Sequence, residues 1–226
     1  MRVLIAGASS GVGLAIAKAI ESHSKHLVLM ARRLDRLEKV ADGLNATSMA
    51  GDVSNYENCS QAVDLLRGSG PLVVINSAGV ADFGSFHESS AEDWSRQIDT
   101  NLLGTLNLCR AAVPHMLEAG QGRIINILSI AAVTAFPGAA AYCASKAGAL
   151  ALGRSLNAEY RTQGIHVVSV VLGSVDTPLW DGKAFVPEKS DMLTPEAVAE
   201  EVVHLAQMPF DRAIDEITLM PPKGIL

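Results

Sequence analysis

Apolar residues in this sequence gather in short runs that are separated by longer stretches of mixed polarity. Several runs are apolar almost without interruption, which is typical of strands covered on both faces of a parallel sheet. The stretches between them are long enough for crossover helices, near 12–23, 33–42, 54–68, 141–162 and 195–207. The strand-like runs span residues 2–7, 26–31, 46–51, 72–77, 123–129, 165–173 and 216–220. The pattern predicts an α/β fold, a doubly wound parallel sheet of about seven strands with helices on both faces.

Composition and charge favour one globular domain and argue against one class of binding partner. The chain has 226 residues, of which 49% are apolar and 19% charged, with a net charge of −6. This is enough for one sizeable core, so we expect residues 1–226 to form a single domain. Nucleic acid is not an expected partner, because binding phosphates needs clustered Lys and Arg, and basic residues cluster here only in "RRLDR" at 32–36.

A charge-free segment at 124–145 is long enough to cross a bilayer. Pro137 and Gly138 interrupt it, and Asn126 and Ser129 dilute it, so we interpret it as a buried strand, a loop and the start of a helix. We expect no membrane association. The first residues show no apolar core with a cleavage site of the secretory type, which favours the cytoplasm.

Three cysteines without CxxC spacing predict neither a disulfide framework nor a zinc site. The six histidines share no ligand spacing with cysteines or carboxylates either. No metal is expected.

A glycine-rich segment, "GASSGVG", follows the first strand and precedes a helical stretch. Gly7, Gly11 and Gly13 would allow a tight turn and let a pyrophosphate approach the backbone N–H groups at a helix N-terminus. No Gly-Lys-Ser/Thr follows, which excludes a nucleoside triphosphate P-loop. An ordinary strand-to-helix turn is the alternative. The segment predicts a dinucleotide site that includes Ser9, Ser10 and Val12.

Tyr142 and Lys146 are four residues apart, which places them on one face of a predicted helix. A phenol with an ordinary pKa near ~10 is a poor base at neutral pH, and a neighbouring cation would lower that pKa. The alternative is a pair of side chains on a solvated helix. Ser129, at the end of a strand thirteen residues earlier, argues against that alternative.

Together with "NSAG" at 76–79, Ser129 and "YCASK" at 142–146, the glycine segment resembles the short-chain dehydrogenase/reductase family, over residues 2 to about 220. The resemblance implies a Rossmann-like domain and an oxidoreductase that interconverts a carbonyl and a secondary alcohol by hydride transfer. It makes Tyr142 the general acid/base, Lys146 its tuning cation and a ribose ligand, and Ser129 a donor to the substrate oxygen. Asn101 would hold a relay water, with a helix cap as its alternative role.

The same resemblance assigns further cofactor contacts. Asp52 would accept from the adenine amino group, with Val53 packed on the ring, while Ser77 and Leu172 depart from the family pattern. A third departure is Ala6, where a threonine is usual. The remaining expected contacts are Asn76, Ala78 and Gly79 after the fourth strand, and Gly173, Val175 and Thr177 near the nicotinamide carboxamide.

Cofactor preference is predicted from the end of the second strand. An NAD site places a carboxylate there, whereas this sequence has Ala31 followed by Arg32 and Arg33, whose guanidinium groups suit a 2′-phosphate. We therefore expect NADP(H), with NAD less favoured. The alternatives are an NAD-dependent alcohol dehydrogenase of the same family and a non-catalytic nucleotide-binding sensor.

The substrate is expected to be a small carbonyl compound or alcohol, covered by a lid at about 178–193. Trp180, Phe185 and Val186 would give this lid an apolar surface, and Gly182 would be its hinge. The small residues on the helix of Tyr142 allow close packing between copies. With the helix after Asn101, they imply a homodimer or homotetramer.

Overall fold

A seven-stranded parallel sheet organises the chain, whose computed structural model describes residues 1–183 and 185–226. The strand order is β3-β2-β1-β4-β5-β6-β7. Each strand lies within about one residue of a predicted apolar run, so the predicted doubly wound sheet is confirmed. The strands are β1 Arg2–Ala6, β2 His26–Ala31, β3 Thr47–Ala50, β4 Leu72–Asn76, β5 Gly122–Ser129, β6 Ile165–Leu172 and β7 Glu216–Leu219.

Seven α-helices connect these strands in the described part of the chain. They are α1 Gly11–Ile20, α2 Leu34–Asp42, α3 Tyr56–Asp64, α4 Ala91–Ile98, α5 Gly104–Ala119, α6 Ala140–Tyr160 and α7 Pro195–Gln207. Side-chain caps fix several starts: Ser90 accepts a hydrogen bond from Asp93 N, and Thr194 from Ala197 N. The apolar pattern did not mark α4 and α5, because a π-helical turn at Asp99–Leu103 separates them and Pro114 lies inside α5.

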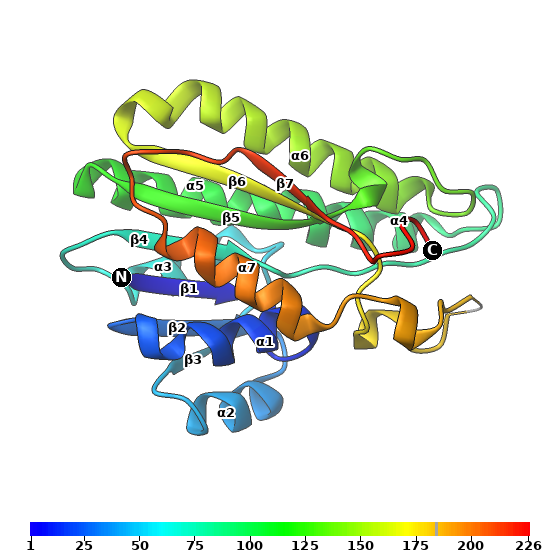
Figure 1. The fold of residues 1–226 in the computed structure, drawn as a ribbon, viewed down its shortest axis with the longest axis horizontal. Coiled ribbons are helices and arrows are strands. Elements are labelled where there is room, and N and C mark those ends of the chain that lie inside the picture. Colours follow the sequence, from blue (N-terminus) through cyan, green and yellow to red (C-terminus); the bar gives the residue numbers. More distant parts are fainter. Residues whose placement is uncertain (184) are drawn as a thin grey trace.

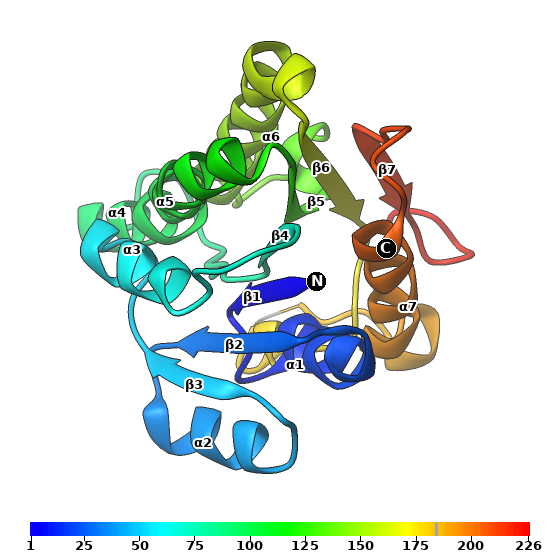
Figure 2. The ribbon, with the colours of Figure 1, turned by 90° about the vertical axis from the view of Figure 1, so that its left-hand side faces the viewer.

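Helices cover both faces of the sheet (Figures 1 and 2). Val3 and Ile5 of β1 pack into the core shared with α1, α2 and α7, whereas Leu4 and Ala6 pack into the core shared with α3 and α5. This alternation follows from the strand geometry, in which successive side chains point to opposite faces. With α6 also on the second side, the central strands are covered on both faces.

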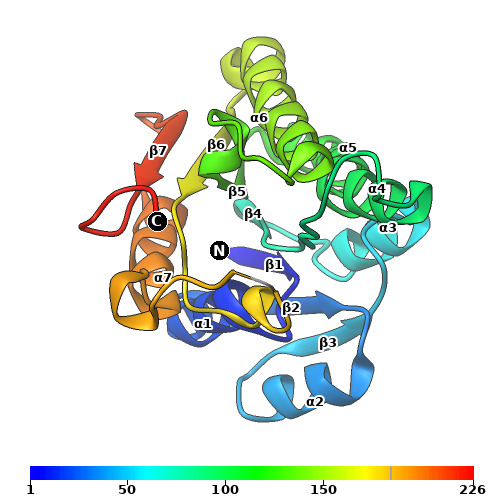
Figure 3. The same cartoon turned by 90° about the vertical axis from the view of Figure 1, so that its right-hand side faces the viewer.

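The carboxyl ends of the parallel strands meet at one edge, which Figure 3 views directly. Loops after β1, β4, β5 and β6 gather there. The segment after β6 crosses this edge and contains two 3₁₀ turns, Pro178–Trp180 and Lys189–Asp191. Within the described residues, no helix has the length and apolar content needed to cross a membrane.

Candidate active site

A cavity of about 1190 Å³ lies along the carboxyl edge of the sheet. It brings together residues from positions 7 to 226, which the strand order places side by side. Gly13, Asn76 and Asn101 do not line it and support it from behind. The predicted residues that line it are Gly7, Ser9, Ser10, Gly11, Val12, Arg32, Arg33, Asp52, Val53, Ala78, Gly79, Ser129, Tyr142, Lys146, Gly173, Val175 and Thr177.

The glycine loop after β1 is packed too tightly for side chains. Gly7 has a φ of +81°, and a Cβ there would lie 2.6 Å from the backbone nitrogen of Ala78. A Cβ on Gly13 would overlap the carbonyl oxygen of Gly7. Ser10 is the N-cap of α1, and its side chain makes no capping hydrogen bond. Backbone N–H groups of the first turn are therefore left to hold an anion.

The loop after β6 completes this end of the cavity. A Cβ on Gly11 would lie 3.2 Å from the Cγ2 atom of Thr177, so the two loops are in contact. Gly173 is equally confined, because a Cβ there would lie 2.5 Å from the Cδ atom of Pro221. A ligand on the glycine loop would therefore also meet the loop after β6.

A basic cluster lines the cavity where β2 ends. Arg32 and Arg33 come directly after Ala31, as the sequence suggested, and Arg36 lines the cavity beside them. Sequence reasoning did not assign Arg36 to the site. Its signal was the basic run "RRLDR" at 32–36, because Arg36 lies in the first turn of α2, three residues after the N-cap Arg33.

Asp52, which follows β3, has a fixed orientation. Its Oδ1 atom accepts hydrogen bonds from Ser54 N at 2.9 Å and from Ser54 Oγ at 2.8 Å, while Asp52 N donates to Asn58 Oδ1 at 3.0 Å. Val53 is buried and its carbonyl accepts from Asn107 Nδ2. The carboxylate keeps Oδ2 for a ligand that donates a hydrogen bond.

Two buried asparagines brace the loop after β4. Asn76 Nδ2 donates to Thr105 Oγ1 at 2.7 Å, and Asn76 Oδ1 accepts from Ala78 N at 3.3 Å. Asn101 Oδ1 accepts from Val80 N at 2.9 Å, and its Nδ2 donates to Val80 O at 2.8 Å. Both asparagines thus fix the course of residues 77–80.

Asn101 also reaches α6, because its Nδ2 donates to Ser145 Oγ at 3.0 Å. It lies in the π-helical turn, a distortion that is frequent at functional sites. The side chain therefore joins the loop after β4 to α6 instead of capping a helix end. A Cβ on Gly79 would lie 3.4 Å from Asn101 Oδ1 and 3.5 Å from Lys146 Nζ, so these groups converge.

Tyr142, Lys146 and Ser129 meet in the cavity. The first turn of α6 holds Tyr142, the next turn holds Lys146, and both side chains are buried. Lys146 Nζ donates to the carbonyl of Ile127 at 3.2 Å and lies 5.9 Å from the centre of the Tyr142 ring. Ser129 ends β5, and its Oγ accepts from Ala131 N at 3.2 Å, which orients the hydroxyl.

Burial dominates the protonation of this pair. It raises the pKa of the Tyr142 phenol, although a hydrogen bond with Ser129 opposes the rise. It lowers the pKa of Lys146 from 10.5 to about 8. The phenol pKa is thus raised in the protein alone, contrary to the lowering expected from Lys146, because desolvation outweighs the opposing hydrogen bond with Ser129. At neutral pH the phenol carries its proton and can donate it.

Three residues that line the cavity near Tyr142 were not predicted, namely Asp82, Phe83 and Lys183. Phe83, in the loop after β4, packs edge to face on Tyr142, with ring centres 5.9 Å apart. Lys183 Nζ donates to Ala81 O at 2.5 Å and lies 3.1 Å from Asp82 Oδ1. The Lys183 contacts join loops about a hundred residues apart in sequence, and no periodic pattern marks any of these contacts.

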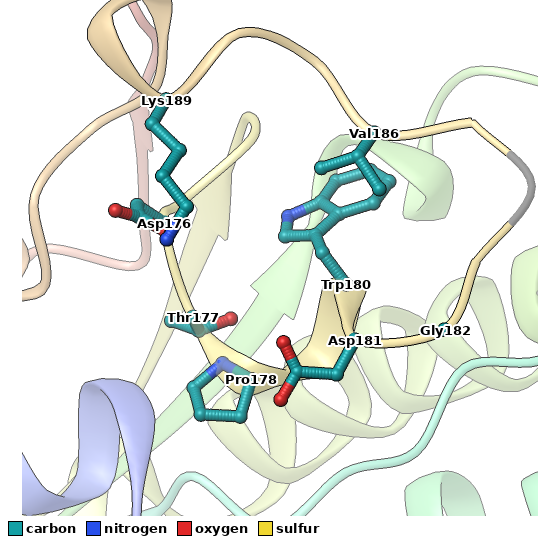
Figure 4. Close-up of a pocket in the computed structure, with 8 residues that line it drawn as sticks. All are labelled: Asp176, Thr177, Pro178, Trp180, Asp181, Gly182, Val186 and Lys189. Carbon is teal, nitrogen blue, oxygen red and sulfur yellow. The ribbon is translucent and has the colours of Figure 1, made fainter.

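Residues 178–193, the predicted lid, lie across this part of the edge, with residue 184 outside the described residues. Trp180 Nε1 donates to Val175 O at 3.0 Å, and the Trp180 ring stacks on Phe83. The same segment encloses a smaller pocket of about 490 Å³ (Figure 4). There Lys189 Nζ lies 3.1 Å from Asp176 Oδ1, and Trp180 and Val186 lie together.

Comparison with known proteins identifies the family. The sequence model of the short chain dehydrogenase family matches residues 1–184. An uncharacterized oxidoreductase of Staphylococcus epidermidis is 34% identical over 224 residues, covering 96% of each chain.

Two solved structures extend the likeness to the fold. An alcohol dehydrogenase from the archaeon Thermococcus sibiricus, complexed with 5-hydroxy-NADP, has a TM-score of 0.87 at 31% identity and covers 97% of this chain and 96% of its own. The closed form of a serine dehydrogenase complexed with NADP⁺ has a TM-score of 0.87 at 26% identity, over 100% and 97%. From its sequence match, its sheet and these relatives, the chain belongs to the short-chain dehydrogenase/reductase family of oxidoreductases.

Proposed function

We propose that the protein is an NADP(H)-dependent oxidoreductase that interconverts a carbonyl compound and a secondary alcohol. One observation carries the proposal: Ser129, Tyr142 and Lys146 line the same cavity as the glycine loop. The groups that can exchange a proton with a substrate and the loop that can bind a dinucleotide thus line the same cavity. A non-catalytic sensor would need the cradle but not the buried phenol and amine.

The residues of the cavity fit a dinucleotide. Gly7, Gly11 and Gly13 leave room for a pyrophosphate beside the start of α1, and Asp52 can accept from an adenine amino group. At the end of β2, a carboxylate is replaced by Ala31, and three arginines can bind a 2′-phosphate. The two similar solved structures hold NADP cofactors, which supports the same preference here.

When bound, the nicotinamide supplies or takes the hydride. In the direction of reduction, Tyr142 Oη donates the proton to the carbonyl oxygen, which matches the raised pKa of its phenol. Ser129 Oγ donates a hydrogen bond to the same oxygen as negative charge develops. Lys146 favours the phenolate that remains, and Asn101 holds the backbone of Val80 beside it.

Residues 178–193 act as the lid in this proposal, and the lid is held closed by Lys183 and by the stacking of Trp180 on Phe83. Close packing of α5 and α6 against a second copy would give a homodimer or homotetramer. Leu103 and Leu106, beside and within α5, are large exposed apolar side chains, which supports such a contact.

The test is an assay of a carbonyl panel with NADPH and with NADH. We expect turnover with NADPH and a lower kcat/KM with NADH. Tyr142→Phe should abolish turnover yet keep NADPH binding, measured by the fluorescence of the reduced cofactor, within a few-fold. Binding of NADPH without turnover of any carbonyl by the wild type would favour the sensor. Preference for NADH would favour the NAD-dependent alternative.

A further inference from the structure

An aromatic side chain beside the reacting phenol is open to the cavity. Phe83 contacts the Tyr142 ring edge to face, at an interplanar angle of 78°. The Trp180 ring also stacks on Phe83 at 6.2 Å and 26°, and Lys183 Nζ lies 5.9 Å from the centre of the Phe83 ring. Phe83 nevertheless remains 44% exposed, and all three rings line the cavity. A bound molecule that reaches Tyr142 would therefore meet the free surface of Phe83.

The wall around Phe83 is apolar on several sides. Phe136 and Phe185 line the same cavity, and Phe136 packs with Tyr142 in one apolar cluster. Such walls bind ligands mainly by removing apolar surface from water, while a few polar groups fix the orientation. Here the polar groups are the hydroxyls of Ser129 and Tyr142, which suit one carbonyl oxygen.

Charged groups beside Phe83 are already paired with each other. Lys183 lies 3.1 Å from Asp82 Oδ1 and also donates to Ala81 O, and Arg96 lies 2.6 Å from Asp82 Oδ2. Asp181 adds a further carboxylate to the lining of the cavity. Among the described residues, this wall thus offers no unpaired cation to a substrate carboxylate or phosphate, and Asp181 would repel one.

We infer that the preferred substrate is an uncharged aryl ketone, or the matching alcohol, whose ring lies against Phe83 while its oxygen meets Tyr142 and Ser129. The inference rests on the proposed function and adds its substrate class. Aromatic rings prefer offset-stacked or edge-to-face contacts and gain from them beyond the area buried. Phe83 is therefore a specificity-determining residue, with Trp180 supporting it.

The experiment compares two probes of similar size, acetophenone and cyclohexyl methyl ketone, and a third, 4-acetylbenzoate, which adds a carboxylate to acetophenone. Wild-type enzyme with NADPH should show a kcat/KM for acetophenone about two- to tenfold above that for the cyclohexyl ketone, the range of one aromatic pair. The charged 4-acetylbenzoate should be the poorest. Phe83→Leu, which keeps an apolar side chain, should bring the aryl preference close to unity. Phe86→Leu is the matched control, since Phe86 is in the same loop, is 63% exposed and packs on Trp94 instead.

Calorimetric binding of the same ketones to the NADP⁺ complex gives a readout that does not need turnover. One outcome is that no ketone is reduced, that acetophenone still binds more tightly than the cyclohexyl ketone, and that Phe83→Leu removes this difference in affinity. The aryl-binding site is then supported, and the proposed oxidoreductase function is contradicted. If ketones are reduced with no aryl preference, or Phe83→Leu and Phe86→Leu behave alike, the function stands and this inference is overturned. Better turnover of 4-acetylbenzoate would also overturn it.

Discussion

Lys146 and Tyr142 are buried on one face of α6, and the Nζ atom of Lys146 lies 5.9 Å from the centre of the Tyr142 ring. Burial favours the neutral form of each group, so the pKa of the phenol is raised and that of the amine is lowered. The pair is thus set to hold a proton on oxygen at neutral pH. Two predictions depend on these directions.

The first concerns the pH dependence of the two directions of reaction. Reduction uses the protonated phenol, so titration of Tyr142 should not lower its kcat/KM between about pH 7 and about pH 9, where any fall would come from Lys146, whose pKa is about 8. Oxidation needs the phenolate, and its kcat/KM should rise with pH over this range, by at most about tenfold per pH unit. Initial rates of ketone reduction and of alcohol oxidation across this range test it. An oxidation rate that is independent of pH would contradict a raised phenol pKa.

The second concerns the stability cost of Lys146. Its pKa is 10.5 in the unfolded chain and about 8 in the fold, so between these values the unfolded state holds more protons and the free energy of unfolding rises with pH. Below about pH 8 the buried cation destabilises the fold by roughly 3 kcal/mol. Lys146→Met should therefore be more stable than wild type at pH 7, and the difference should shrink toward pH 10.

Urea unfolding of both proteins at the two pH values measures this difference directly. Cys59 and Cys109 also have raised pKa values, but they are common to both proteins and cancel in the comparison. The raised pKa of the Tyr142 phenol keeps its proton in place at neutral pH in the folded protein. A difference that does not change with pH would show that Lys146 is not desolvated in the fold. Loss of turnover in the same variant would be expected in either case.

A third prediction tests whether Arg32 recognises the 2′-phosphate of NADP(H). Arg32→Ala should weaken NADPH binding by about 1.5–3 kcal/mol, the range for a hydrogen bond to a charged group, with little change for NADH. Ala31→Asp should move the preference further toward NADH. Arg67→Ala is the control, because this exposed arginine pairs with Asp64 and does not line the cavity. Equal losses of both cofactors in Arg32→Ala would count against the assignment.

A fourth prediction concerns the packing of the glycine loop. A Cβ at Gly13 meets the Gly7 carbonyl, so Gly13→Ala should lower the free energy of unfolding by about 1–3 kcal/mol and weaken NADPH binding. Gly43→Ala is the matched control. Gly43 has a φ of −84°, and its added Cβ would have no neighbour closer than 3.7 Å, so stability should be unchanged or slightly higher. Thermal unfolding and a cofactor titration separate the two outcomes.

The strands could be predicted because a doubly covered parallel strand leaves a continuous apolar run, as in "IHVVSVVL" of β6. Glycine spacing and the Tyr142–Lys146 interval were equally visible, since both depend on local chain geometry. Arg36 was also detectable, as the last residue of the basic run at 32–36, although it was overlooked.

Contacts between distant loops could not be predicted. Phe83 meets Tyr142 and Trp180 only because the loops after β4 and β6 fold over the same edge, and a Phe in an irregular loop carries no periodic signal. The direction of the Tyr142 pKa was missed for a related reason. Spacing shows that a cation is near, whereas burial, which decides the shift, depends on the whole fold.

The three arginines that line the cavity near the end of β2 do not stabilise another part of the protein through their side chains. Among the side-chain hydrogen bonds and ion pairs within the described residues, none involves Arg32, Arg33 or Arg36, and all three are exposed. Nothing in the core therefore depends on them, in contrast to Arg123, whose buried guanidinium binds the carbonyls of Leu205 and Met208 at the end of α7. Substitutions at these surface positions can therefore change the preferred coenzyme, during evolution or engineering, without lowering the stability of the fold.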